Sequence, residues 1–172
     1  LLFWPFSNER VTWNNISVVD PIFTIPVLVL AVTAMITRKP LLSFFAIGWM
    51  TFYLLLGFVQ YERAFLVAND LAHSRGHTPE RLTLKPSFGN LILWKSIYQY
   101  EENFYVDAIR TAFSSTWCLG ESIRMFDYQY HLPNLEKDSQ QRKDIERFRW
   151  FSQDYLGFDV DKNLVTDVRY SM

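Results

Sequence analysis

The sequence predicts a membrane α-helical hairpin followed by a small α+β domain with an antiparallel sheet. Residues 21–37 and 41–59 are two uncharged, strongly apolar segments separated by a short basic connection. After them, short stretches rich in β-branched and aromatic residues alternate with polar turns, and one amphipathic helical pattern follows near the end. Most charged residues lie after residue 59, so the chain combines two unlike halves.

The two apolar segments are close to the length of about 20 residues that a helix needs to cross a bilayer. Pro26 removes one backbone donor from the first segment, and we expect a bend there. Arg38 and Lys39 place the connection on the cytoplasmic side by the positive-inside rule, with both ends of the pair on the opposite face. A buried helical pair in a soluble protein is the alternative that this pattern leaves open.

These patterns divide the chain into four regions. Residues 1–20 form a pre-membrane segment, 21–59 two transmembrane helices, 60–78 a helix that leaves the membrane, and 79–172 a soluble α+β domain. Gly76 is placed to end the third region in a left-handed conformation, and Pro79 opposes its continuation. Because the sequence does not begin with methionine, we expect it to be part of a longer polypeptide.

The soluble region is predicted to contain four strands and one helix. Strands are predicted at 82–85, 91–100, 104–113 and 164–170, with 91–100 and 104–113 forming a β-hairpin. Apolar residues at 145, 148, 151 and 155 have helical spacing, and Gly157 is predicted to stop this helix. Residues 131–141 are polar, contain Pro133 and are predicted to form a loop.

Composition excludes several classes of function. With 17 basic and 18 acidic residues the net charge is −1, so the chain lacks the positive field of a nucleic-acid-binding protein. The lone Cys118 cannot form an intrachain disulfide and is expected to be a buried apolar thiol. His73 and His77 have the spacing of a zinc pair, but Gly76 between them breaks the helix that such a pair needs.

Polar residues at the ends of the apolar segments are the first candidates for function. Asp20 stands directly before Pro21, where an acid either caps the first helix or serves a site at the membrane edge. Arg63 follows the second segment, and antiparallel helices would bring it to the same surface as Asp20. Acidic residues further on, including Asp107, are expected to be solvated at or near turns.

Several short motifs resemble the membrane-bound metal-dependent hydrolases, also described as LexA-binding inner-membrane-associated hydrolases. The two most specific segments are residues 2–10 with 19–21, which read LFWPFSNER and VDP, and residues 147–152, which read RFRWFS. Further matches follow the order of the family along the chain: Arg63, Arg75-Gly76-His77 with Pro79, Trp94, and Arg169-Tyr170. The resemblance covers nearly the whole chain.

The resemblance implies a multi-pass protein of the bacterial inner membrane that acts as a metal-dependent hydrolase. It implies a divalent metal ion, zinc or manganese, whose histidine and aspartate ligands lie in an earlier portion outside this chain. Ser7, Arg10 and Asp20 are then the candidate catalytic residues beside that site, and Arg63 is a candidate substrate-binding residue. Position at the membrane edge favours the bilayer itself and a membrane-surface or lipid-linked substrate as partners.

Two other interpretations remain open. The chain is alternatively a non-enzymatic, membrane-anchored module that binds a partner protein or a small ligand. Exposed strand edges and the aromatic-rich segments 94–105 and 126–130 would form its surface, unless these aromatic residues pack in the core. The other is that the soluble domain serves only to stabilise and orient the membrane helices.

Overall fold

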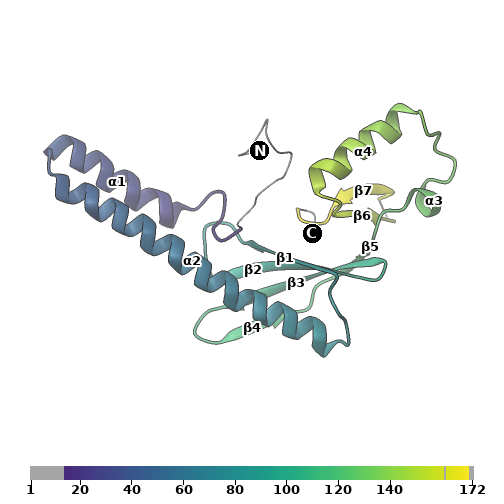
Figure 1. The fold of residues 1–172 in the computed structure, drawn as a ribbon, viewed down its shortest axis with the longest axis horizontal. Coiled ribbons are helices and arrows are strands. Elements are labelled where there is room, and N and C mark those ends of the chain that lie inside the picture. The colour runs from purple at the N-terminus through teal and green to yellow at the C-terminus, as the bar shows by residue number, and fades with distance from the viewer. Residues whose placement is uncertain (1–13, 161, 171–172) are drawn as a thin grey trace. The chain divides into compact units, whose positions relative to one another are not determined.

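A computed structural model describes residues 14–160 and 162–170 of the chain. This part of the chain contains helices and an antiparallel sheet, as predicted (Figure 1). The elements in order are α1 Pro21–Thr37, α2 Pro40–Ser74, β1 Arg81–Pro86, β2 Leu93–Tyr100, β3 Asn103–Thr111, β4 Ser115–Cys118, β5 Ser122–Arg124, α3 Tyr128–His131, α4 Gln140–Ser152, β6 Leu156–Asp159 and β7 Leu164–Asp167.

Contacts divide the chain into two compact units. Unit 1 contains the described residues up to Leu66 together with Leu84–Trp94 and Arg110–Ser115. Unit 2 contains Val67–Thr83, Lys95–Ile109 and the described residues from Thr116 onward. The two apolar helices therefore belong mainly to unit 1, and most of the sheet, α3 and α4 belong to unit 2.

In unit 1, α1 and α2 lie side by side as an antiparallel pair (Figure 1). Asp20 caps the start of α1, and Arg38 ends it in a left-handed conformation with a φ of 53°. The ring of Phe23 on α1 contacts that of Tyr53 on α2, with 5.6 Å between the ring centres. The predicted helical pair is therefore present, and α1 accommodates Pro26 within its length.

Most large apolar side chains of this pair face outward. α1 has no buried residue, and Met35 and Phe44 are 73% and 70% exposed. By length and composition, α2 is the one helix in the described part of the chain that is able to cross a membrane, whereas α1 is apolar but shorter. Placement of both helices in a bilayer stays a prediction.

The second helix continues past the apolar segment, as predicted, and runs without a break from Pro40 to Ser74. Ala64, Ala68 and Ala72 recur every four residues and are buried, so this stripe of the helix faces the interior. Gly76 has a φ of 77°, the left-handed conformation expected at the end of a helix. The helix ends four residues earlier than the predicted boundary at residue 78.

The main sheet has the strand order β1-β2-β3-β4, and β5 pairs with β3 away from this path. The predicted hairpin is β2 and β3, and Glu101 in its turn has a left-handed φ of 52°. In the β3–β5 register, Asn103 lies opposite Arg124 and Tyr105 opposite Ser122. The strands β4 and β5 were not predicted, because four and three residues are too few to show an alternating pattern.

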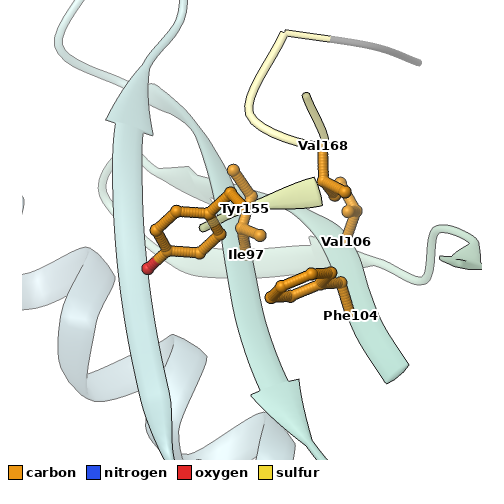
Figure 2. Packing of buried hydrophobic residues seen from close by; sticks show 5 residues of the cluster. All are labelled: Ile97, Phe104, Val106, Tyr155 and Val168. Carbon is orange, nitrogen blue, oxygen red and sulfur yellow. The ribbon is translucent and has the colours of Figure 1, made fainter. Parts of the chain in front are cut away.

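The core of unit 2 joins residues far apart in the sequence. Ile97 from β2 and Phe104 and Val106 from β3 pack with Tyr155 and Val168 near the end of the chain (Figure 2). Of the two alternatives for segment 94–105, a partner surface or core packing, the structure shows core packing for the largest side chains. Trp94, Tyr98 and Phe104 have no exposed surface and are core residues.

Two predictions for the last third of the chain are wrong. Helix α4 ends at Ser152, and Gln153 stops it in a left-handed conformation, so Tyr155 belongs to the core rather than to the helix. Gly157 lies within β6, which pairs with β7. A Cβ atom there would lie 2.7 Å from Ile123 Cδ1, so close packing explains the glycine.

Cys118 is exposed, contrary to the prediction of a buried thiol. It is the last residue of the short strand β4, in which Thr116, Trp117 and Cys118 are all exposed. A strand with so few buried positions offers no apolar site for the sulfur.

Candidate functional site

Asp20 is buried at the start of α1 and is only 3% exposed. Its Oδ1 accepts a hydrogen bond of 3.1 Å from the Phe23 backbone N–H, which is the geometry of a helix N-cap. Its Oδ2 accepts a hydrogen bond of 2.7 Å from the hydroxyl of Tyr53 on α2. The predicted cap is confirmed, and a second partner holds the other oxygen.

Tyr53 is the residue of this site that the sequence did not reveal. It lies 33 positions after Asp20, in the middle of an apolar segment, and is 4% exposed. Its ring packs against Phe23 and Trp49, so the hydroxyl is aimed at the carboxylate by side chains on both helices. The sequence does contain one signal for it, a tyrosine within a segment of leucines and phenylalanines. Such a tyrosine indicates a hydrogen-bond partner nearby, because a buried hydroxyl needs one.

The site can hold a charged carboxylate in a fixed orientation. An ionised carboxylate has about four acceptor positions, so two remain after the Phe23 and Tyr53 bonds. Burial makes an unpaired charge costly, and the two donors offset part of that cost. The arrangement therefore suits Asp20 to accept a proton or to orient a neighbouring group.

Arg63 does not pair with Asp20. Its Nη1 donates to Gln60 Oε1 at 2.8 Å, and its Nη2 donates to the Ala112 carbonyl at 2.8 Å. Tyr53, which does contact Asp20, precedes Arg63 by ten residues, or about 15 Å along a helix. The antiparallel helices therefore bring residue 53 rather than residue 63 to the level of Asp20.

Arg63 connects α2 to the backbone at the end of β3. Gln60 beside it donates from Nε2 to the Thr111 carbonyl at 2.9 Å, so two side chains of α2 bind the backbone at the end of β3. These hydrogen bonds lie directly after the apolar part of α2, within unit 1.

Substrate binding by Arg63 stays a prediction. Ser7 and Arg10, the other candidate catalytic residues, lie outside the described residues.

A second polar cluster, in unit 2, joins the end of α2 to β2 and β3. Arg75 and Asp107 form a two-pronged ion pair with N–O distances of 2.7 and 2.9 Å, and the Asp107 side chain is 2% exposed. Asp107 also accepts a hydrogen bond of 3.0 Å from the Gly120 N–H. The prediction that Asp107 is a solvated turn residue is therefore wrong.

Tyr98 connects this ion pair to His77. Its oxygen accepts a 2.8 Å hydrogen bond from Arg75, and its hydroxyl lies 2.9 Å from His77 Nδ1. Burial raises the pKa of Tyr98, although Arg75 acts in the opposite direction, so the phenol keeps its proton at neutral pH. The hydrogen bond between the hydroxyl and Nδ1 has a direction that depends on the tautomer of the imidazole.

The same cluster explains why His77 does not continue the helix. Its ring stacks on Tyr100 with 4.3 Å between ring centres and lies 4.7 Å from Tyr105. The ion pair with Asp107 raises the pKa of the Arg75 guanidinium, which stays charged. Arg75, Asp107, Tyr98 and His77 are connected by hydrogen bonds, so the cluster is suited to fixing the end of α2 on the sheet.

No group of three or more His, Cys, Asp or Glu side chains in the described part of the chain is placed to hold a metal ion. Comparison of the chain with protein-family models, with curated proteins and with solved structures found no match. A functional assignment therefore rests on the motifs in the sequence and on the geometry of the site.

The bond between Tyr53 and Asp20 makes a measurable prediction. We expect Tyr53→Phe to lower the free energy that protects the first amides of α1 from hydrogen exchange. The expected decrease is about 1.5–3 kcal/mol, the range for a hydrogen bond to a charged group. In a double-mutant cycle with Asp20→Ala, the Tyr53→Phe effect should largely disappear, because its partner is gone. Hydrogen exchange of the α1 amides in detergent measures both.

Thr51→Val is the matched control for this cycle. It removes a hydroxyl from the same helix, and that hydroxyl donates to the Ile47 carbonyl of its own helix at 3.0 Å. Exchange at the start of α1 should not change. Equal effects of Tyr53→Phe with and without Asp20 would show that the hydroxyl does not hold the carboxylate.

Proposed function

We propose that the chain is anchored in a membrane by α1 and α2. The observation that carries this proposal is the outward apolar surface of the pair, in which only 17% of the most apolar stretch of α2 is buried. A helix in the core of a soluble protein would be mostly buried. Exposing this surface to water costs about 25 cal/mol of free energy for each Å² of apolar area. Exposing it to lipid tails does not carry this cost.

Polar side chains within the two helices also suit a bilayer. Thr33 donates its hydroxyl to the Val29 carbonyl at 2.7 Å, and Thr37 donates to the Thr33 carbonyl at 2.7 Å. These side chains satisfy their hydroxyls inside their own helix, so neither needs water. Asp20, which stands directly before α1, is held by two donors.

We further propose that the complete protein is a metal-dependent hydrolase of the bacterial inner membrane. This proposal is supported by the WPFS, VDP and RFRWFS motifs and by the fixed, buried carboxylate of Asp20. The described residues do not form a metal site by themselves. Residues outside them would hold the divalent ion, zinc or manganese, whose chemistry is to activate water and polarise the substrate.

In this proposal the chain's own residues prepare the surroundings of the reaction. Tyr53 and the Phe23 N–H fix Asp20, which accepts a proton or orients a group beside the metal. Arg10 holds an anionic group of the substrate, and Ser7 contributes a hydrogen bond. A phosphate or ester of a lipid-linked substrate lies at the depth where a helix enters the bilayer, which is the position of Asp20 in this arrangement.

Elemental analysis tests the proposal on two detergent-purified proteins, this chain and the longer polypeptide that the resemblance implies. We expect stoichiometric zinc or manganese in the longer protein and none in the chain alone. Asp20→Asn in the longer protein should lower hydrolysis of p-nitrophenyl phosphate or p-nitrophenyl acetate by about 10- to 100-fold, as for residues that orient metal ligands. Glu136→Gln, at an exposed residue of unit 2, is the control.

Absence of metal from both proteins would reject the hydrolase proposal. The alternative is then a membrane-anchored binding module, which one feature of unit 2 favours. A pocket of about 450 Å³ lies between β5 and the β6–β7 pair. Charged side chains of both signs line it: Glu121, Arg124, Asp159 and Lys162. Such a mixed lining suits a small zwitterionic ligand.

A further inference from the structure

Two loops of unit 1 expose large apolar side chains. The first loop, residues 87–92, connects β1 to β2, and the second, residues 112–114, connects β3 to β4 (Figure 1). Phe88 is 70% exposed, Ile92 is 45% exposed and Phe113 is fully exposed. These three residues are called the loop rim below.

Hydrogen bonds hold the two loops beside each other. The Thr111 N–H, at the end of β3, donates to the Ile92 carbonyl at 2.7 Å. Within the first loop, Asn90 Oδ1 accepts from the N–H groups of Ile92 and Leu93 at 3.0 and 2.7 Å. The Ser87 N–H donates to the Leu93 carbonyl at 2.8 Å and closes this loop. The two loops therefore form one hydrogen-bonded edge of unit 1, and the loop rim lies on it. Because its exposed apolar side chains are gathered at one edge, they require a physical explanation.

The same edge contacts both apolar helices of unit 1. A Cβ atom on Gly89 would lie 3.3 Å from Pro21 Cδ, so the first loop lies against the first residue of α1. The second loop and the end of β3 accept hydrogen bonds from Arg63 and Gln60, which directly follow the apolar segment of α2. The loop rim therefore lies at the end of the helix pair where α1 begins and the apolar part of α2 stops.

Exposed apolar surface continues from α1 toward the loop rim. Ile22, in the first turn of α1, is more than half exposed, and Val18 and Val19 before the helix are exposed as well. Phe88 is the neighbour of Gly89, which lies against Pro21, so its ring is close to this surface. The loop rim and the outer surface of α1 are thus parts of one apolar region.

The charged side chains at this edge are of both signs. Arg63, Lys85 and Arg110 are basic, and Glu62 and the buried Asp20 are acidic. Three basic and two acidic groups give the edge little net charge. Affinity for a bilayer would therefore come from the apolar side chains of the loop rim and would not require anionic lipids.

We infer that the loop rim enters the headgroup boundary of the bilayer that holds α1 and α2. Phenylalanine and isoleucine gain free energy by leaving water, and the contacts with α1 and α2 place them at the depth of this boundary. Asn90 satisfies two amides of the loop, which suits backbone in a region with little water. The inference rests on the proposed anchoring and adds a second contact with lipid, which fixes the tilt of the helix pair.

Spin labels test this inference on the whole chain in phosphatidylcholine nanodiscs. Phe88→Cys and Ser114→Cys, each in a Cys118→Ser background, place one nitroxide in each loop. Val29→Cys, at an exposed position in the middle of α1, gives the reference for the bilayer interior. Collisions with oxygen report lipid, and collisions with a water-soluble nickel chelate report water. We expect both loop labels to favour oxygen less than the Val29 label does, but more than a lipid labelled at its headgroup.

Matched substitutions test whether the rings cause this placement. In Phe88→Ser with Phe113→Ser, the Ser114 label should report a ratio of lipid-inserted to hydrated loop that is lower by about 100-fold. This estimate takes about tenfold for each ring, the lower end of the range for burying a phenylalanine side chain. Phe88→Leu with Phe113→Leu keeps two apolar side chains and should leave the Ser114 label in lipid.

The outcomes distinguish this inference from the proposal on which it rests. If the Val29 label collides mainly with the nickel chelate, the anchoring proposal fails. If the Val29 label is in lipid but the loop labels collide mainly with the nickel chelate, anchoring stands and the inference is overturned. Loop labels shielded from both reagents would also overturn it, because protein from a second copy would then cover the loop rim. So would a Ser114 label that stays in lipid in the double serine variant with unchanged circular dichroism, because the rings would then not cause the placement.

Discussion

Replacing Asp107 by alanine is expected to destabilise unit 2 by about 3–5 kcal/mol, the range observed when one partner of a buried ion pair is removed. The substitution leaves the Arg75 guanidinium, 22% exposed, without its carboxylate. It also removes the acceptor of the Gly120 N–H. Both losses act on the point where the end of α2 is fastened to β3.

Hydrogen exchange of the β2 and β3 amides in detergent measures this effect directly. A loss of about 3–5 kcal/mol corresponds to exchange faster by about two to nearly four orders of magnitude in the most protected amides. Glu102→Ala is the matched control, because it breaks the 2.5 Å ion pair with Arg124, in which both side chains are well exposed. That substitution should cost at most about 1 kcal/mol.

Equal effects of the two substitutions would contradict this account. Burial, rather than N–O distance, is the property that separates them: the two pairs have similarly short distances, 2.7 and 2.5 Å, but Asp107 is 2% and Glu102 73% exposed. A small effect of Asp107→Ala would mean that water or a rearranged side chain compensates Arg75. Asp107→Asn, which keeps the shape and loses the charge, would then identify which of these occurs.

Features set by neighbouring residues were predictable from the sequence. The two apolar helices, the cap at Asp20, the end of α2 near Gly76 and the β2–β3 hairpin all depend on patterns within a few positions. Their signals are local because helix caps, left-handed turns and hairpins are local structures. The structure reproduces each of them with small changes in boundary.

Features set by distant partners were not predictable. The Tyr53–Asp20 bond joins residues 33 positions apart, and the Arg75–Asp107 pair joins residues 32 apart. Asp107 was expected to be solvated, although it lies in a strand on the same face as Ile109 and Thr111, which are buried. A single acid in such a pattern indicates a buried partner, but the sequence does not show where that partner lies.

Trp94 gives the second large effect that we expect. Its side chain has no exposed surface, its indole N–H donates to the Leu91 carbonyl and to Thr111 Oγ1, each at 3.1 Å, and its ring meets Tyr61 of α2 edge to face. Trp94→Ala removes this packing and leaves a cavity within unit 1. We expect a loss of about 3–5 kcal/mol in the free energy of unfolding.

Trp117→Ala is the control that isolates burial as the cause. Trp117 lies on the edge strand β4 and is 56% exposed, so the same change of side chain should alter the free energy of unfolding by no more than about 0.5 kcal/mol. Near-ultraviolet circular dichroism during thermal unfolding in detergent compares the two variants. Similar midpoints for both would mean that unit 1 derives its stability from the apolar helices alone, and Trp94 would then contribute nothing to holding α2 against the strands. A lower midpoint for Trp94→Ala alone would identify this contact as a principal link between the helix that leaves the apolar segment and the sheet that follows it.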